Sequence, residues 1–208
     1  MNEYILITLL FIGSYILGAI PFAYIFTKVF SHKDIMGLGW KKSSASNVLY
    51  NVGKIPALLT FLFDVFKGFI VIYIAQLLGL DIIIQALAGL LVIIGHNWSI
   101  FLGFRGGRGL ASVIGVVLAF NPFMLLIALI PLIFFTIIWT ASIGTIVSYL
   151  FLIGWSYMDN IYGLFIFLVL ALIPIIIKRI SPFNSLKGNL RNRLLFDQDG
   201  VPKLRIKK

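Results

Sequence analysis

An apolar stretch that runs almost without interruption from Leu110 to Ile177 constrains this chain more than any other feature. The rest of the sequence has the same character, since 61% of the 208 residues are hydrophobic and only 12% are charged. Ordinary soluble domains contain roughly half apolar and about a quarter charged residues. The composition therefore excludes an ordinary soluble domain and predicts an all-α membrane protein that crosses the bilayer several times.

The N-terminal half divides readily into spans. Apolar runs extend from Tyr4 to about Phe30, from Pro56 to Leu80 and from Ile82 to Phe101. Each is long enough to cross about 30 Å of hydrocarbon at about 1.5 Å per residue. Gly18 and Pro21 should kink the first run, which is too long and too polar there for a cleaved signal peptide.

Residues 110–177 are harder to divide. Turn-forming residues at 121–122, 140–144 and 158–160 predict four short spans, hence seven crossings in all. Two long helices would instead give five crossings, but each would need extreme tilt. We therefore expect seven crossings in a single integral-membrane domain that covers residues 1–208.

The charges predict an orientation. With the N-terminus outside, the acidic residues Glu3, Asp81 and Asp159 lie outside, and every basic residue except Lys67 lies on the inner side. The positive-inside rule then gives N-out and C-in. The net charge of +10 is explained by a basic rim that attracts anionic lipid and needs no nucleic acid. The absence of cysteine excludes a disulfide framework and a thiolate site.

A glycine-rich loop follows the third span, with the sequence Phe-Arg-Gly-Gly-Arg-Gly at residues 104–109. Its glycines permit positive φ and close approach of a ligand, and its arginines offer planar forks of donors. A helix beginning at Leu110 would add the positive end of its dipole. The loop therefore predicts a phosphate site, unless it is merely a basic turn that obeys the positive-inside rule.

Polar side chains also occur within the predicted spans. His96 and Asn97 end the third span, where they are costly unless they face protein or a polar cavity. Asp64 and Lys67 share one helix face, and this pair either locks helices together or contacts substrate. No group of residues has the spacing of metal ligands, so neither a metal nor another cofactor is expected.

Four motifs occur in order: Gly-Ala-Ile-Pro-Phe at 18–22, Phe-Asp-Val-Phe-Lys-Gly at 63–68, Gly-His-Asn-Trp at 95–98, and the loop at 104–109. Together they resemble the bacterial integral-membrane acyl-phosphate:glycerol-3-phosphate acyltransferases, the PlsY family, in which lysines stand at positions 105 and 108. The resemblance implies acyl transfer from acyl phosphate to the hydroxyl of glycerol 3-phosphate, which gives lysophosphatidic acid in phospholipid synthesis. It also implies a multi-pass protein of the bacterial cell membrane, with its active site toward the cytoplasm.

The resemblance implies the following site residues. The catalytic group is His96, Asn97, Ser46, Asn47 and Ser142; the phosphate- and substrate-binding group is Arg105, Gly106, Gly107, Arg108, Gly109, Lys42, Asn189 and Arg193. An acyl phosphate is already activated, so no covalent nucleophile is needed. The base is either His96 or the phosphate of the acceptor. The expected partners are acyl phosphate, glycerol 3-phosphate and membrane lipids, and the expected state is a monomer.

Three regions depart from the family pattern. Residues 40–47 read Trp-Lys-Lys-Ser-Ser-Ala-Ser-Asn, where the family has Ser-Gly-Asn-Ile-Gly-Ala-Thr-Asn, and Tyr50 replaces an Arg. Thr136 stands where an Arg is usual, ahead of Ser142, and Trp139 replaces a serine. The tail at 189–195 matches the third motif of the family imperfectly and has no His. A non-catalytic relative that binds acyl phosphate or anionic lipid is therefore the alternative. A small-solute transporter is a third hypothesis, but the sequence shows no internal repeat to support it.

Overall fold

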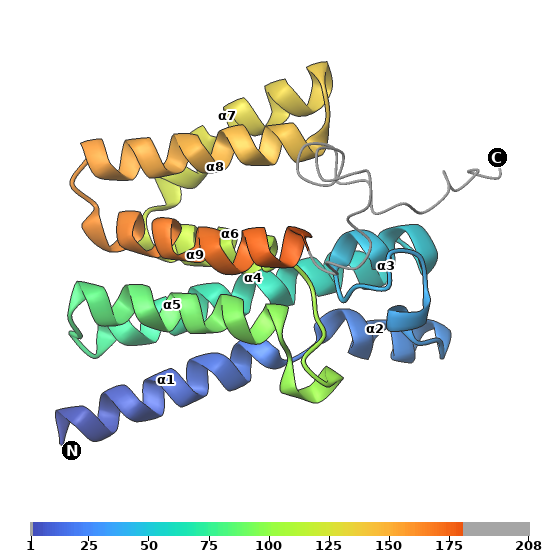
Figure 1. The fold of residues 1–208 in the computed structure, drawn as a ribbon, viewed down its shortest axis with the longest axis horizontal. Helices are drawn as coiled ribbons and strands as arrows, with labels where there is room; N and C mark the ends of the chain where they lie inside the picture. Colours follow the sequence, from blue (N-terminus) through green and yellow to red (C-terminus); the bar gives the residue numbers. More distant parts are fainter. Residues whose placement is uncertain (1, 181–208) are drawn as a thin grey trace.

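The computed structural model describes residues 2–180, which form a bundle of helices that run side by side (Figure 1). The described residues contain no β-strand and one isolated β-bridge, between Ser99 and Arg105. The helices are α1 (Glu3–Ala19), α2 (Phe22–Ser31), α3 (Ala45–Asn51), α4 (Lys54–Leu77), α5 (Ile82–Asn97), α6 (Leu110–Phe120), α7 (Pro122–Ile138), α8 (Ala141–Met158) and α9 (Tyr162–Ile180), with short 3-10 turns η1 (Ile35–Gly37) and η2 (Ile100–Leu102).

The predicted helix breaks are confirmed, and three of them have a clear local cause. The first run breaks at Ile20 and Pro21, since proline has no N–H to continue the helix. Asn121 separates α6 from α7, and its side chain accepts a hydrogen bond from the Met124 N–H. Thr140 caps α8 in the same way through the Ile143 N–H. The helices are therefore interrupted where a side chain caps the start of the next helix, or where a proline lacks the N–H that would continue the helix.

The predicted end of the third span was wrong. The helix α5 ends at Asn97, four residues before Phe101. The chain then folds back, with the Ser99 N–H donating to the Arg105 carbonyl at 3.2 Å and the Ser99 hydroxyl donating to the Ala19 carbonyl at 2.5 Å. These bonds anchor the loop of residues 98–109 against the end of α1.

Four stretches are long and apolar enough to cross a membrane: Glu3–Ser31, Lys54–Leu77, Ala141–Met158 and Tyr162–Ile180. The helices α5, α6 and α7 are apolar but shorter. The all-helical membrane fold expected from composition is thus confirmed at this level. Pro131 and Pro174 lie inside helices, in α7 and α9.

Close helix packing sets the positions of the site. Gly95 on α5 lies directly against the backbone of α1, and Gly115 on α6 lies against the backbone of α4, so that any side chain at either glycine would overlap the neighbouring helix. The main core is formed by buried residues of α4 to α9. As a result, α3, the C-terminal ends of α5 and α9 and the start of α6 meet at one end of the bundle (Figure 1).

Candidate active site

A cavity of about 520 Å³ lies at this end of the bundle. Its wall contains both polar and apolar residues, and the apolar ones come from the first loop and from α3, α4, α6 and α8. The polar and glycine residues of the wall are Lys42, Ser44, Ser46, Asp64, His96, Gly107, Arg108, Gly109, Thr140, Ser142, Thr145 and Arg179; the others are Trp40, Ala45, Tyr50, Phe61, Leu110, Ala111, Ile114 and Ala141. The cavity can therefore hold a molecule that has both an anionic and an apolar part.

The glycine-rich loop forms one wall, but its glycines act differently from the prediction. Gly109 has a positive φ of 77°, whereas Gly106 and Gly107 are not in the positive-φ region. A side chain on Gly106 would overlap the carbonyl groups at the end of α5, and one on Gly107 would overlap the His96 ring. The Gly107 N–H donates to the His96 carbonyl at 3.2 Å. These two glycines thus bring the loop close to α5.

Asp64, Lys67 and His96 form a buried cluster at the inner end of the cavity. Lys67 Nζ lies 2.7 Å from Asp64 Oδ1 and 2.8 Å from His96 Nδ1. Lys67 Nζ also donates to the Gly18 carbonyl at 3.0 Å. Lys67 thus ties α4 to the end of α1, as the helix-locking interpretation predicted. Asp64 and His96 line the cavity, and their contact with substrate stays a prediction.

Asn47 organises the first loop from behind the cavity wall. Its side-chain amide donates to the carbonyls of Ile35, Leu38 and Lys42 at 3.3, 3.1 and 2.9 Å. Its Oδ1 accepts from the Trp40 N–H at 3.2 Å. Asn47 is fully buried and does not line the cavity, unlike its neighbour Ser46. The structure therefore gives Asn47 a supporting place rather than one against substrate.

Three other predicted residues also do not line the cavity. The Asn97 amide donates to the Pro174 carbonyl at 3.2 Å and joins α5 to α9. The Arg105 Nε donates to the Leu102 carbonyl at 3.3 Å, and this side chain is exposed beside the loop. Gly106 packs against the end of α5, as described above. Asn189 and Arg193 lie outside the described residues.

A sequence model of the family described as glycerol-3-phosphate acyltransferase matches residues 8–187. This chain belongs to that family. Glycerol-3-phosphate acyltransferase 4 of Dehalococcoides mccartyi is 46% identical over 117 residues, which cover 56% of this chain and 50% of the relative. The chain thus spans about half the length of the curated relatives that it matches first.

Two crystal structures of PlsY, described as an integral membrane glycerol 3-phosphate acyltransferase, have the same fold. The glycerol 3-phosphate form has a TM-score of 0.75 and 27% identity, over 87% of this chain and 92% of that chain. The lysophosphatidic acid form has a TM-score of 0.72 and 29% identity, over 87% and 91%. The resemblance drawn from the four motifs is confirmed.

The sequence of this acyltransferase family member did not single out Arg179 as a site residue. Arg179 is buried, lines the cavity and donates to the Ser142 hydroxyl from the last turn of α9. Lys178 and Arg179 together end an apolar run, and the positive-inside rule already explains such a pair. Only the packing of α9 against α8 distinguishes Arg179 from the rest of the basic rim.

Proposed function

We propose that this chain transfers an acyl group from an acyl phosphate to glycerol 3-phosphate. The observation that carries the proposal is the cavity itself, which is lined by Arg108 of the glycine loop, Lys42 of the first loop and Arg179 of α9. The apolar wall beside them suits an acyl chain. Anionic head and apolar tail are the two features that acyl phosphate and lysophosphatidic acid have in common.

The residues of the cavity supply binding, orientation and charge stabilisation. The acceptor hydroxyl attacks the acyl carbonyl, a C–O bond to glycerol 3-phosphate forms, and the bond from the acyl carbon to phosphate oxygen breaks. The hydroxyl proton passes to a phosphate oxygen, since a phosphate with a pKa of about 6 can accept it near neutral pH. Arg108, Lys42 and Arg179 balance the phosphate charge that accumulates. Gly107 and Gly109 shape the loop, while Ser46 and Ser142 contact substrate oxygens.

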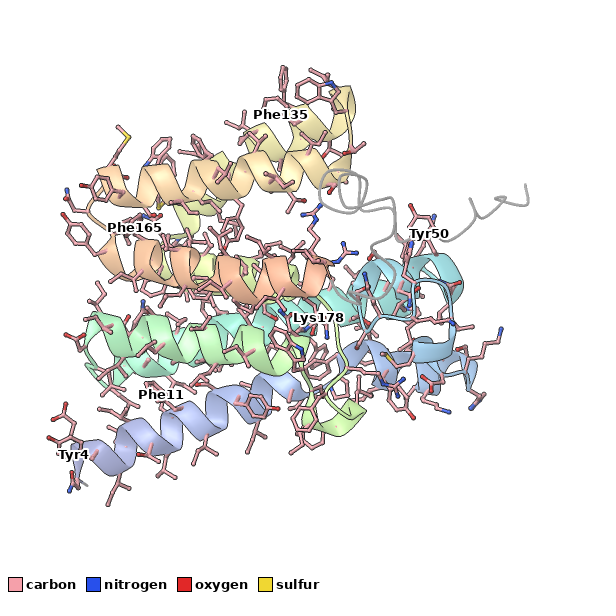
Figure 2. All side chains as sticks on the ribbon, in the orientation of Figure 1. Tyr4, Phe11, Tyr50, Phe135, Phe165 and Lys178 are labelled. Atoms are coloured by element: carbon pink, nitrogen blue, oxygen red, sulfur yellow. The ribbon has the colours of Figure 1, made fainter. Side chains whose placement is uncertain are left out.

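We further propose the topology expected from the charges, with seven crossings, the N-terminus outside and the cavity toward the cytoplasm of a bacterial cell. The described Lys and Arg residues other than Lys67 lie in the last turn of α2, at the start of α4, at the end of α9, or in the loops before α3 and α6. The helices α4 to α9 run in alternate directions, and α3 lies at one end of the bundle (Figure 1). Tyr50 and Lys178 are at that end, and Tyr4 and Phe165 are at the other (Figure 2). The positive-inside rule favours this orientation.

The short helix α6 supports a site that is sunk into the membrane. Its 11 residues rise only about 16 Å at about 1.5 Å per residue, which is roughly half of the hydrocarbon thickness. The loop of residues 98–109 must therefore occupy part of this crossing. Irregular backbone at such a depth is tolerated where it is buried in protein or lines a polar cavity.

The test is acyl transfer by the purified chain in lipid. Radiolabelled palmitoyl phosphate and glycerol 3-phosphate should yield labelled lysophosphatidic acid, whereas palmitoyl-CoA as donor should not. A chain that binds palmitoyl phosphate but yields no product would contradict the proposed catalysis and would favour a non-catalytic binding protein.

A further inference from the structure

The ring of His96 is held at one nitrogen and leaves the other at the cavity. Its Nδ1 lies 2.8 Å from Lys67 Nζ and 3.4 Å from Asp64 Oδ1. Its Nε2 lies against Gly107, because a side-chain carbon on Gly107 would overlap this atom. Gly107 and His96 both line the cavity, whereas Lys67 is buried behind it. The ring thus presents Nε2 to the phosphate loop.

The contacts of Lys67 bear on which nitrogen of the His96 ring carries the proton. An ammonium group has three N–H donors and no lone pair. The shortest contacts of Lys67 Nζ are to Asp64 Oδ1 at 2.7 Å, to His96 Nδ1 at 2.8 Å and to the Gly18 carbonyl at 3.0 Å, and the Ile20 carbonyl lies further away, at 3.5 Å. Nδ1 lies closer to this donor, at 2.8 Å, than to Asp64 Oδ1, at 3.4 Å. An Nδ1 that accepts from the ammonium group leaves the single proton of the neutral ring on Nε2.

The break in the first span keeps Lys67 in this position. In a continuous helix the Gly18 carbonyl would accept from the Phe22 N–H. Here that N–H turns to the Ile20 carbonyl at 3.2 Å, and the Gly18 carbonyl is open to Lys67. The Asp64 carboxylate balances the ammonium charge, so the buried group is not left uncompensated. Two helices thus fix the donor that faces His96.

We propose that Lys67 is a positioning residue that holds His96 as its Nε2–H tautomer, so that His96 donates a hydrogen bond to a substrate oxygen beside Gly107. In this state Nε2 has no lone pair and cannot remove the proton of the acceptor hydroxyl. His96 therefore stabilises a phosphate or carbonyl oxygen, and the proton leaves with phosphate. The identity of that oxygen rests on the proposed function, whereas the tautomer is a property of the chain without substrate.

The tautomer can be measured directly because the chain has only two histidines. His32 is exposed and has a φ of 57°, which asparagine tolerates, so His32→Asn leaves His96 as the single imidazole. The experiment is magic-angle-spinning NMR of this chain in lipid bilayers at neutral pH, with ¹⁵N-labelled histidine. We expect Nδ1 to give the signal of an unprotonated nitrogen and Nε2 that of an N–H. A proton on Nδ1 would overturn the proposal without any change at Lys67.

Variants of Lys67 test the cause. Lys67→Met removes the donor and should move the ring proton to Nδ1, where Asp64 can accept it. Lys67→Arg should keep the proton on Nε2, because guanidinium also only donates. Lys178→Met is the matched control: it removes an ammonium group that lies 5.2 Å from the Trp98 ring centre, and it should leave the tautomer unchanged. An unchanged tautomer in a folded Lys67→Met chain would refute the positioning role.

Inorganic phosphate then tests the donor role in the same sample. Its addition should shift the Nε2 nitrogen and its proton and leave Nδ1 unprotonated. A chain that synthesises lysophosphatidic acid although phosphate leaves the Nε2 signal unmoved would refute the donor role of His96, while the proposed function would stand.

Discussion

The guanidinium group of Arg179 donates a hydrogen bond to the hydroxyl of Ser142, and this contact joins the end of α9 to the start of α8 at the cavity wall. Both side chains are buried. The family pattern has an Arg ahead of Ser142, at the position where this chain has Thr136. In this chain the guanidinium group that contacts Ser142 belongs to Arg179, which lies 37 residues further along the chain, on α9.

Arg179→Met should weaken binding of the acceptor. Loss of a hydrogen bond to a charged group costs about 1.5–3 kcal/mol, so the KM for glycerol 3-phosphate should rise about tenfold to a hundredfold. The KM of Arg179→Lys should lie between those of the unaltered chain and Arg179→Met, because lysine keeps the charge but lacks the planar fork of donors. Steady-state acylation with varied glycerol 3-phosphate measures both. Lys178→Met, which changes a neighbour outside the cavity wall, is the control, and equal effects of the two Met variants would argue for general charge alone.

Gly107→Ala should inactivate the protein, even though alanine is small. The added carbon would overlap His96 Nε2 and the Ser43 carbonyl, so the loop must move away from the ring. A displacement of about 1 Å at reacting groups can cost on the order of a hundredfold in rate. Gly37→Ala is the matched control, because no atom lies within 4 Å of its added carbon. Normal acylation by a folded Gly107→Ala chain would mean that the loop does not contribute to the site.

Asp64 and Lys67 allow stability to be separated from activity. Asp64→Leu alone leaves a buried ammonium group without its counter-ion and should destabilise the chain by about 3–5 kcal/mol. The double variant Asp64→Leu, Lys67→Met removes both charges and should recover most of that loss. We expect thermal unfolding to show this recovery while acylation stays low, since His96 loses its fixed tautomer. Full activity in the double variant would leave the pair with a structural role only.

The sequence predicted the features that depend on residues close together in the chain. Pro21, Asn121 and Thr140 mark helix breaks because each changes the hydrogen bonds of its own turn. The residues that line the cavity could not be predicted from local patterns, because two neighbours in the sequence can have different surroundings in the fold. His96 lines the cavity, whereas Asn97, the next residue, turns to the Pro174 carbonyl on α9. That division depends on how α5 and α9 pack.

The proposed orientation can be tested with introduced cysteines, because the chain has none. Cysteines at Asp81 and Asp159 should react with an impermeant maleimide in intact cells, since both positions are exposed at the end of the bundle that we place outside. A cysteine at Lys33, which is exposed at the other end, should react only after permeabilisation. Labelling of the Lys33 position in sealed cells would reverse the topology.

The first loop offers the most specific change, at Lys41. This residue has a φ of 53°, a conformation that costs an L-residue with a side chain about 1–2 kcal/mol, and the family has glycine there. Lys41→Gly should therefore stabilise the folded chain by up to about 1 kcal/mol, once the greater chain entropy of glycine is subtracted. Thermal unfolding measures this, and an unchanged or lower midpoint would mean that the Lys41 side chain contributes contacts of its own.

Trp40 and Lys42 line the cavity beside that turn, where the family has serine and asparagine. The Trp40 ring packs edge-on against Tyr50, with 5.1 Å between ring centres, and both residues occupy space at the cavity. Lys42 retains positive charge, so alignment of the acceptor should suffer more than its binding. We expect the triple variant Trp40→Ser, Lys41→Gly, Lys42→Asn to raise kcat with glycerol 3-phosphate more than it changes KM. Steady-state acylation at saturating palmitoyl phosphate decides this, with Lys41→Gly alone as control. If the unaltered chain is already faster, then the tryptophan and lysines form a different working arrangement of the same site.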